Sequence, residues 1–142
     1  MLLTIDIGNS NIVLGLYDGA TLKDSWRAAT DSRRTSDEYA VMAYDFLARR
    51  GYRTEQVTDC AISSVVPALT PVFRQLAQRY WEIEPLVVGI GIDLGLRVLT
   101  DNPSEVGADR IVNAVAAKAI YGTPAIVIDL GTATTFDVVS PD

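Results

Sequence analysis

The chain has 142 residues, of which 49% are apolar, and this proportion suits a globular protein with a hydrophobic core. Its net charge of −6 argues against nucleic acid as a partner, because phosphate contacts need clustered Lys and Arg. It contains no histidine, which excludes Ser-His-Asp and Cys-His mechanisms within the chain and leaves a carboxylate, or less often Lys, Tyr or Cys, as a general base.

The first part of the chain predicts three strands followed by a helix. The strands are expected over residues 2–7, 12–17 and 22–27. Asp18-Gly19 is a tight hairpin signal between the second and third strands. Thr35 and Glu38 have the spacing of a capping box, and apolar residues at helical intervals follow them as far as Gly51, which ends the helix.

The remainder of the chain alternates strands and helices. The expected order is a strand around residues 60–62, a helix over about 67–80, a strand at 85–88, a glycine-rich link at 89–95, a helix over about 105–121, and strands at 125–129 and 134–139. The last two strands enclose an Asp-x-Gly turn, as the first two do. We therefore expect a complete domain over residues 1–101 and the beginning of a duplicated, truncated second domain over residues 102–142.

The Asp-x-Gly pattern occurs twice, starting at Asp6 and again at Asp129. An Asp at a strand end can face a phosphate-bound metal ion or a water, and the Gly after it lets the backbone approach a phosphate and offer its N–H groups. A single copy is better explained as an ordinary hairpin, since Asn and Gly dominate turns. The duplication favours a nucleotide clamp made of two such turns.

A third candidate site lies in residues 101–110, which contain Asn102-Pro103 and the pair Asp109-Arg110. Adjacent helical residues point about 100° apart, so these two charges do not naturally pair with each other. They form either a solvated charged pair or a site in which Asp109 accepts a proton and Arg110 holds an anionic group such as a carboxylate. Spacing alone leaves both interpretations open.

Cysteine usage and hydropathy predict the compartment. Cys60 is the single cysteine and cannot form an internal disulfide, which fits a reducing environment. No signal peptide is visible, because Asp6 interrupts the first apolar run, and no stretch approaches membrane-spanning length. We therefore expect a cytoplasmic protein with no membrane partner.

Together, the three segments resemble the type III pantothenate kinases, a branch of the acetate/sugar kinase–Hsp70–actin superfamily. The resemblance is carried by residues 6–13, by residues 102–103 with 107–110, and by residues 129–135, in this order along the chain. It implies the ribonuclease H-like actin/sugar-kinase fold, an α/β fold with a mixed sheet. Chains of the family continue well past this point, so the resemblance also implies a fragment or a reduced protein that keeps the motifs.

The resemblance implies ATP-dependent phosphorylation of pantothenate to 4′-phosphopantothenate, the first step of coenzyme A biosynthesis, by a homodimer whose acceptor site is completed across the interface. The residues that it places around ATP are Asp6, Ile7, Gly8, Asn9, Ser10, Asn11, Ile12, Val13 and Thr132. It implies that Asp129 coordinates a monovalent cation, K⁺ or NH₄⁺. Asp6 is the candidate for facing Mg²⁺ bound with ATP.

The residues that the resemblance places on pantothenate are Gly107, Ala108, Asp109 and Arg110. Arg110 would hold the carboxylate of pantothenate, and Asp109 would be the catalytic base that takes the hydroxyl proton. Thr100 stands where many family members have a Tyr that touches the substrate. Phosphoryl transfer needs positioning, charge neutralisation and one modest base, so these roles agree with a chain that lacks histidine.

Other functions stay open at the level of the sequence. Members of the family have also been described as transcriptional accessory factors, which would make the chain a regulatory binding protein. Another alternative is a different sugar or acid kinase of the same superfamily. Arg110 discriminates against a sugar kinase, because a neutral sugar needs no carboxylate clamp. A catalytically incomplete fragment would show the same motifs.

Overall fold

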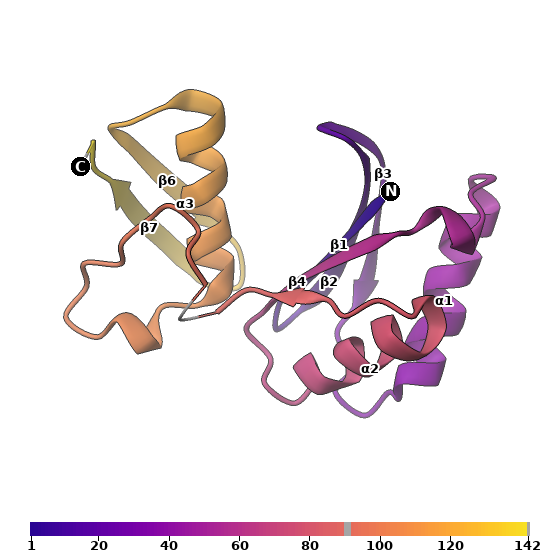
Figure 1. The fold of residues 1–142 in the computed structure, drawn as a ribbon. Helices are drawn as coiled ribbons and strands as arrows, with labels where there is room; N and C mark the ends of the chain where they lie inside the picture. The colour runs from indigo at the N-terminus through magenta and orange to yellow at the C-terminus, as the bar shows by residue number, and fades with distance from the viewer. Residues whose placement is uncertain (90–91, 142) are drawn as a thin grey trace. The chain divides into compact units, whose positions relative to one another are not determined.

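The computed structural model describes residues 1–89 and 92–141 (Figure 1). The chain divides into two compact units, Met1–Val87 and Val88–Asp142. The glycine-rich link expected at residues 89–95 falls at the start of the second unit, and its residues 90 and 91 lie outside the described part. The division into domains 1–101 and 102–142 stays a prediction.

The first unit contains a mixed sheet of five strands in the order β3-β2-β1-β4-β5. The strands are β1 (Leu2–Ile7), β2 (Asn11–Asp18), β3 (Thr21–Ala29), β4 (Asp59–Ser64) and β5 (Leu86–Val87). β2 is antiparallel to β1 and β3, whereas β4 is parallel to both β1 and β5. The hairpin expected at Asp18-Gly19 is confirmed, and Gly19 has the positive φ of 57° that the primed hairpin turns require.

Two helices, α1 (Ser36–Arg49) and α2 (Thr70–Trp81), pack on one face of this sheet (Figure 1). Alternate residues of β1, such as Leu3 and Ile5, are 1% exposed and belong to the same apolar cluster as the helices. Tyr39 of α1 and Phe73 of α2 are fully buried, with ring centroids 4.6 Å apart. Burial of each such side chain contributes about 1.5–3 kcal/mol, so the first unit has a core of its own.

The ends of the two helices follow local chemistry. The capping box of α1 is confirmed, because Thr35 Oγ1 accepts from the Glu38 amide at 3.3 Å and a Glu38 carboxylate oxygen accepts from the Thr35 amide at 2.8 Å. α2 begins at Thr70 rather than at about residue 67, since residues 67–69 form a turn in which the Leu69 amide donates to the Val66 carbonyl. A short 3₁₀ helix, η1 (Thr54–Gln56), precedes β4.

The second unit has one long helix packed on a two-stranded antiparallel hairpin. Its elements are the 3₁₀ helix η2 (Pro103–Glu105), α3 (Ala108–Tyr121), β6 (Ala125–Leu130) and β7 (Thr134–Val139). α3 begins at Ala108 rather than at about residue 105, because Gly107 has an extended backbone and is the N-cap residue. The carboxylate of Glu105 instead accepts a hydrogen bond from the Asn102 amide group at 2.6 Å.

The outer face of the β6–β7 hairpin is apolar and exposed. Its large side chains are between 56% and 79% exposed: Ile126, Ile128, Leu130, Phe136 and Val138. On the other face, which packs against α3, Val139 is 5% exposed. The hairpin therefore buries one of its two faces within the described part of the chain.

Within residues 1–89 and 92–141, no helix has both the length and the apolar character that a membrane-spanning helix requires.

Candidate functional site

The turn between β1 and β2 holds the first Asp-x-Gly motif. Ile7 pairs with Ile12 in the hairpin, and the Gly8 amide donates to the Asn11 carbonyl at 3.0 Å across the turn. A Cβ atom on Gly8 would lie 3.1 Å from the same carbonyl oxygen, closer than side chains normally approach. A side chain at residue 8 would therefore require this carbonyl to shift by a few tenths of an ångström. Asn9 and Ser10 are exposed, as residues that contact a ligand on this loop would need to be.

A polar segment after β3 holds this turn in place. Thr30 Oγ1 donates to the Gly8 carbonyl at 2.7 Å, and the Thr30 amide donates to the Ser10 carbonyl at 3.1 Å. The next residue, Asp31, is fixed by the buried Tyr39, whose hydroxyl donates to the Asp31 carbonyl at 2.9 Å. The roles of Thr30 and Tyr39 as supports of the motif were not predicted, because their contacts join segments that no local pattern connects.

The turn between β6 and β7 holds the second motif. The segment between its paired residues is one residue shorter than in the β1–β2 turn. Asp129 pairs with Thr135 and Leu130 with Thr134, whereas in the first hairpin Asp6 pairs with Val13. The Gly131 amide donates to the Ala133 carbonyl at 3.1 Å. A Cβ on Gly131 would meet that carbonyl oxygen and Asp129 Oδ1 at 3.7 Å, which is ordinary contact. The second turn is thus less crowded than the first.

Asp129 lines a small pocket of about 280 Å³ between α3 and β6. The other lining residues are Asn113, Ala116, Ala117, Ile120, Tyr121, Val127 and Ile128. Thr132, the expected ATP contact of this turn, is exposed. Asp129 and Thr132 therefore lie at the same end of the hairpin but in different surroundings. The Asp129 side chain lies beside α3, and Thr132 is exposed to solvent.

Each motif aspartate has the chemistry to contact a cation that is also bound by a phosphate. Within residues 1–89 and 92–141, no three Asp, Glu or Cys side chains gather closely enough to hold a metal by themselves. Mg²⁺ is usually held by one or two carboxylates together with substrate phosphates and waters, so a single Asp6 has the donor chemistry for such an ion. Asp129 offers the same hard oxygen donors to a monovalent cation.

The third segment places its two charged residues in the first turn of α3. Asp109 Oδ1 accepts from the Arg110 amide at 2.8 Å. The guanidinium of Arg110 turns to β7, where its Nε donates to Asp137 Oδ1 at 2.8 Å. The side chain of Asp137 is 15% exposed and that of Arg110 is 34% exposed. This contact raises the pKa of Arg110, chiefly through its hydrogen bond to Asp137, so Arg110 is a fixed charge rather than a freely solvated one.

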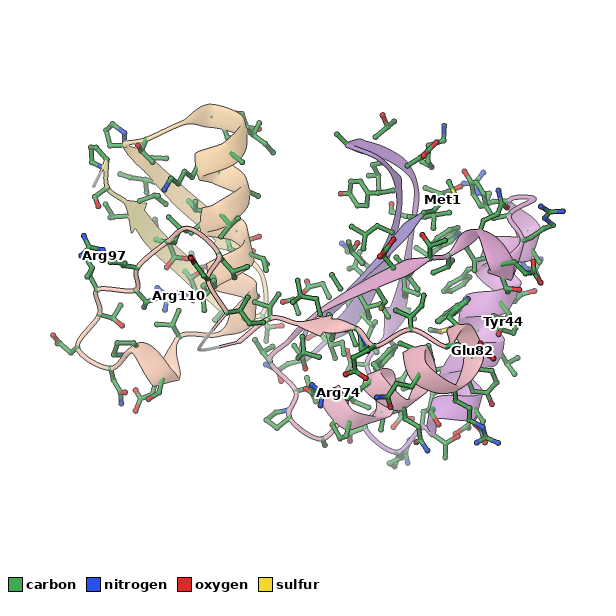
Figure 2. All side chains as sticks on the ribbon, viewed as in Figure 1. Met1, Tyr44, Arg74, Glu82, Arg97 and Arg110 are labelled. Carbon is green, nitrogen blue, oxygen red and sulfur yellow. The ribbon has the colours of Figure 1, made fainter. Side chains whose placement is uncertain are left out.

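A pocket of about 430 Å³ lies next to this ion pair within the second unit. Its polar lining includes Arg110, Asp137 and Lys118, and its apolar lining includes Val106 and Phe136. Figure 2 shows Arg110 beside the loop that precedes α3. Lys118 Nζ donates to the Gly95 carbonyl at 2.9 Å and attaches this loop to the helix.

The structure brings only part of the expected acceptor site to this pocket. Arg110 and Thr100 line it, whereas Gly107, Ala108 and Asp109 are not among the lining residues. Ala108 is 8% exposed, and Gly107 and Asp109 are half-buried at the start of α3. Sequence analysis missed Asp137, although an acidic residue within the second motif's strand was a visible signal.

The sequence model of the type III pantothenate kinase family matches residues 2–142. The chain belongs to this family. Curated relatives with that name come from Paramagnetospirillum magneticum (55% identical over 143 residues), Geotalea daltonii (51% over 140) and Myxococcus xanthus (48% over 141). The matches cover 99–100% of this chain and 55% of each relative. The chain therefore spans about half the length of the curated relatives it matches.

A solved structure supports the fold assignment. The crystal structure of a protein named as an N-acetylglucosamine kinase from Porphyromonas gingivalis superposes with a TM-score of 0.53 over 99% of this chain and 45% of that chain. The sequences are 14% identical, so this likeness concerns the fold alone. The expected actin/sugar-kinase fold with a mixed sheet is confirmed.

Proposed function

We propose that this chain takes part in the ATP-dependent phosphorylation of pantothenate to 4′-phosphopantothenate, the first step of coenzyme A biosynthesis. The observation that carries the proposal is the family match over residues 2–142, which includes all three motif segments in order. The two glycine turns and the charged start of α3 supply the elements that phosphoryl transfer needs, namely phosphate contacts, a base and an anion clamp.

The nucleotide is assigned to the two Asp-x-Gly turns. In this proposal residues 6–13 and Thr132 surround ATP, Asp6 faces Mg²⁺ bound with the phosphates, and Asp129 holds K⁺ or NH₄⁺. The bound cations would neutralise charge that develops on the transferred phosphoryl group. The hydrogen bonds from Thr30 to the Gly8 turn support this role, because a loop that is already held in position binds phosphate without further ordering.

Pantothenate is assigned to residues 107–110. Asp109 takes the proton of the primary hydroxyl as that oxygen attacks the phosphoryl group. Arg110 directs its Nε and one terminal nitrogen to Asp137, and its remaining N–H groups are left to donate hydrogen bonds to the carboxylate of pantothenate. Asp137 and a bound carboxylate would then lie on different edges of one guanidinium, a geometry that its planar shape allows.

The cellular setting is proposed on the family resemblance and the composition. We infer a cytoplasmic homodimer whose acceptor site is completed across the interface. The single buried Cys60 fits a reducing compartment. A net charge of −6 gives no support to direct DNA binding, which a transcriptional accessory factor acting alone would require.

The test is pantothenate-dependent formation of ADP by the 142-residue chain in the presence of ATP, Mg²⁺ and K⁺, with phosphopantothenate detected by mass. The control replaces pantothenate with its alcohol analogue, which lacks the carboxylate. We expect product with pantothenate and a much higher KM for the alcohol. Absence of product would contradict the proposal for this chain, and equal use of both acceptors would favour a kinase of another specificity.

A further inference from the structure

Ser63 is buried near the end of β4 and has a hydroxyl without a partner. The residue is 7% exposed, and within residues 1–89 and 92–141 its Oγ has no hydrogen-bond partner. Buried hydroxyl groups are nearly always hydrogen-bonded, because a polar group that loses water and gains nothing is destabilising. An exception in a folded protein needs an explanation, and a ligand that supplies the missing partner is one.

The strand register places Ser63 beside the first phosphate motif. β1 and β4 are parallel, and Asp6 pairs with Ser63. Residues in register on adjacent strands share a face, and such strands lie about 4.8 Å apart. The helix-covered face is taken by Ile5 and Ile62, so Asp6 and Ser63 lie on the other face, close to the strand ends from which the Gly8 turn begins. Ligands of open α/β sheets bind at these carboxyl ends.

The neighbouring Ser64 shows what a structural hydroxyl does in this segment. Ser64 Oγ donates to the Val66 carbonyl at 3.2 Å, and it accepts from Thr70 Oγ1 at 3.0 Å. These bonds fix the turn that leads into α2. Adjacent residues of a strand point to opposite faces, so Ser64 and Ser63 differ in both direction and bonding. The Ser64 hydroxyl therefore stabilises the local structure, whereas the Ser63 hydroxyl makes no hydrogen bond within the described residues.

The same relation recurs in the second motif. Thr135 pairs with Asp129 in the β6–β7 hairpin. Its Oγ1 is also buried and has no hydrogen-bond partner in the described part of the chain. Both motif aspartates therefore have an in-register neighbour that carries an unpaired hydroxyl. The surroundings differ, because Thr135 shares the face of Val139, which packs against α3, whereas Ser63 lies on the face away from the helices.

We propose that Ser63 is a nucleotide-binding residue of the first phosphate site and that its Oγ–H donates to a phosphate oxygen of ATP held at the Gly8 turn. This inference rests on the proposed function and adds a residue to its ATP site. The hydroxyl is suited to the position beside Asp6, because it supplies a donor where the carboxylate supplies only acceptors. Its burial keeps water from competing for the bond.

The experiment compares Ser63→Ala with Ser64→Ala in the full 142-residue chain. Each variant is measured twice, by thermal unfolding without ligand and by calorimetric titration with ATP and Mg²⁺. For Ser63→Ala we expect an unchanged or higher unfolding temperature and a Kd for ATP that is raised about tenfold, as for loss of one hydrogen bond to a charged group. For Ser64→Ala we expect a lower unfolding temperature and a Kd within about twofold of the parent chain.

Each possible result is decisive. A Kd for Ser63→Ala within about twofold of the parent contradicts the inference while leaving the ATP site intact. An unfolding temperature lowered as much as in Ser64→Ala also contradicts it, because Ser63 would then have a structural partner. Failure of the parent chain to bind ATP overturns the proposed nucleotide site itself and the role of Ser63 with it. The binding of the parent chain thus separates the two failures.

Discussion

The two units contain the same Asp-x-Gly turn but support it in different ways. In the first unit the turn closes a hairpin inside a five-stranded sheet, and Thr30 anchors it at two carbonyls. In the second unit the hairpin has two strands, and residues such as Ile128 and Phe136 remain exposed on its outer face. The difference teaches that a short motif determines the turn, whereas the number of strands and helices around it determines how much of it is buried.

The units also differ in how far their ion pairs are exposed. In the second unit, Arg110 of α3 pairs with Asp137 of β7, and their side chains are 34% and 15% exposed. In the first unit, Arg50 at the end of α1 pairs with Asp24 of β3, and the arginine side chain is 62% exposed. The first unit's Arg49 and Asp45 both lie in solvent. We therefore expect changes in the core and at the helix ends of the first unit to act on stability, and changes at the start of α3 to act on catalysis. The following variants test this separation, beginning with the largest expected effect.

The largest effect is expected from Asp109→Asn. Loss of the proposed base should lower turnover of pantothenate by about 10²- to 10⁴-fold, while the unfolding temperature stays close to that of the parent chain. Steady-state kinetics and thermal unfolding measure the two quantities. Asp101→Asn is the matched control, because Asp101 is exposed and carries no proposed role. Retained turnover in Asp109→Asn would remove Asp109 as the base.

A matched pair of phenylalanine truncations compares the packing of the two units. Phe73→Ala should cost about 3–5 kcal/mol of unfolding free energy, because the side chain is fully buried in the first unit. Phe136→Ala should change it by no more than about 0.5 kcal/mol, since Phe136 is 63% exposed. Chemical denaturation gives both values. Equal losses would mean that the outer face of the hairpin is covered in solution.

Asp137→Asn should remove the ion pair that orients Arg110. We expect a loss of about 1–3 kcal/mol in unfolding free energy and a higher KM for pantothenate with an unchanged KM for ATP. Asp45→Asn is the control in the first unit, where the pair with Arg49 lies in solvent and its loss should leave the unfolding free energy nearly unchanged. If both Michaelis constants rose together, Asp137 would be supporting the whole unit rather than Arg110.

Thr35→Ala tests the cap of α1. Loss of the hydrogen bond from the Glu38 amide should lower the unfolding free energy by about 1 kcal/mol. Turnover at saturating substrates should not change, because this cap stabilises the first unit without contacting either motif. Denaturation and initial-rate measurements report the two results. A fall in turnover beyond the loss of folded protein would contradict the separation of roles.

The smallest effect on stability at neutral pH is expected from ionisation of the Cys60 thiol. Burial raises the pKa of its thiol to about 12, and the residue is 4% exposed. The pKa of the Cys60 thiol in the folded chain lies above its unfolded value of about 8.5. Burial of the neutral thiol therefore contributes fully to stability below about pH 8.5, and this contribution is lost as the pH rises towards 12. Labelling of the native chain with a thiol reagent at about pH 8 should be slow. Rapid labelling would show that the first unit opens.

Much of the fold was predictable because it depends on neighbouring residues. The hairpin at Asp18-Gly19 and the cap at Thr35 each need only a few adjacent side chains. The first residues of α2 and α3 were predicted less accurately. Pro67 suggested an early start of α2, and Glu105 an early start of α3, but a turn and the extended Gly107 place both starts later.

The family, the two glycine turns and the alternation of buried and exposed strand positions could be predicted from residue order, since these are local properties of the chain. The tertiary structure alone decided that Thr30 anchors the Gly8 turn, that Asp137 holds Arg110, and that Ser63 lies beside Asp6. Each of these contacts joins distant segments. They depend on strand register and helix packing, in which a shift of one residue would turn a side chain to the opposite face.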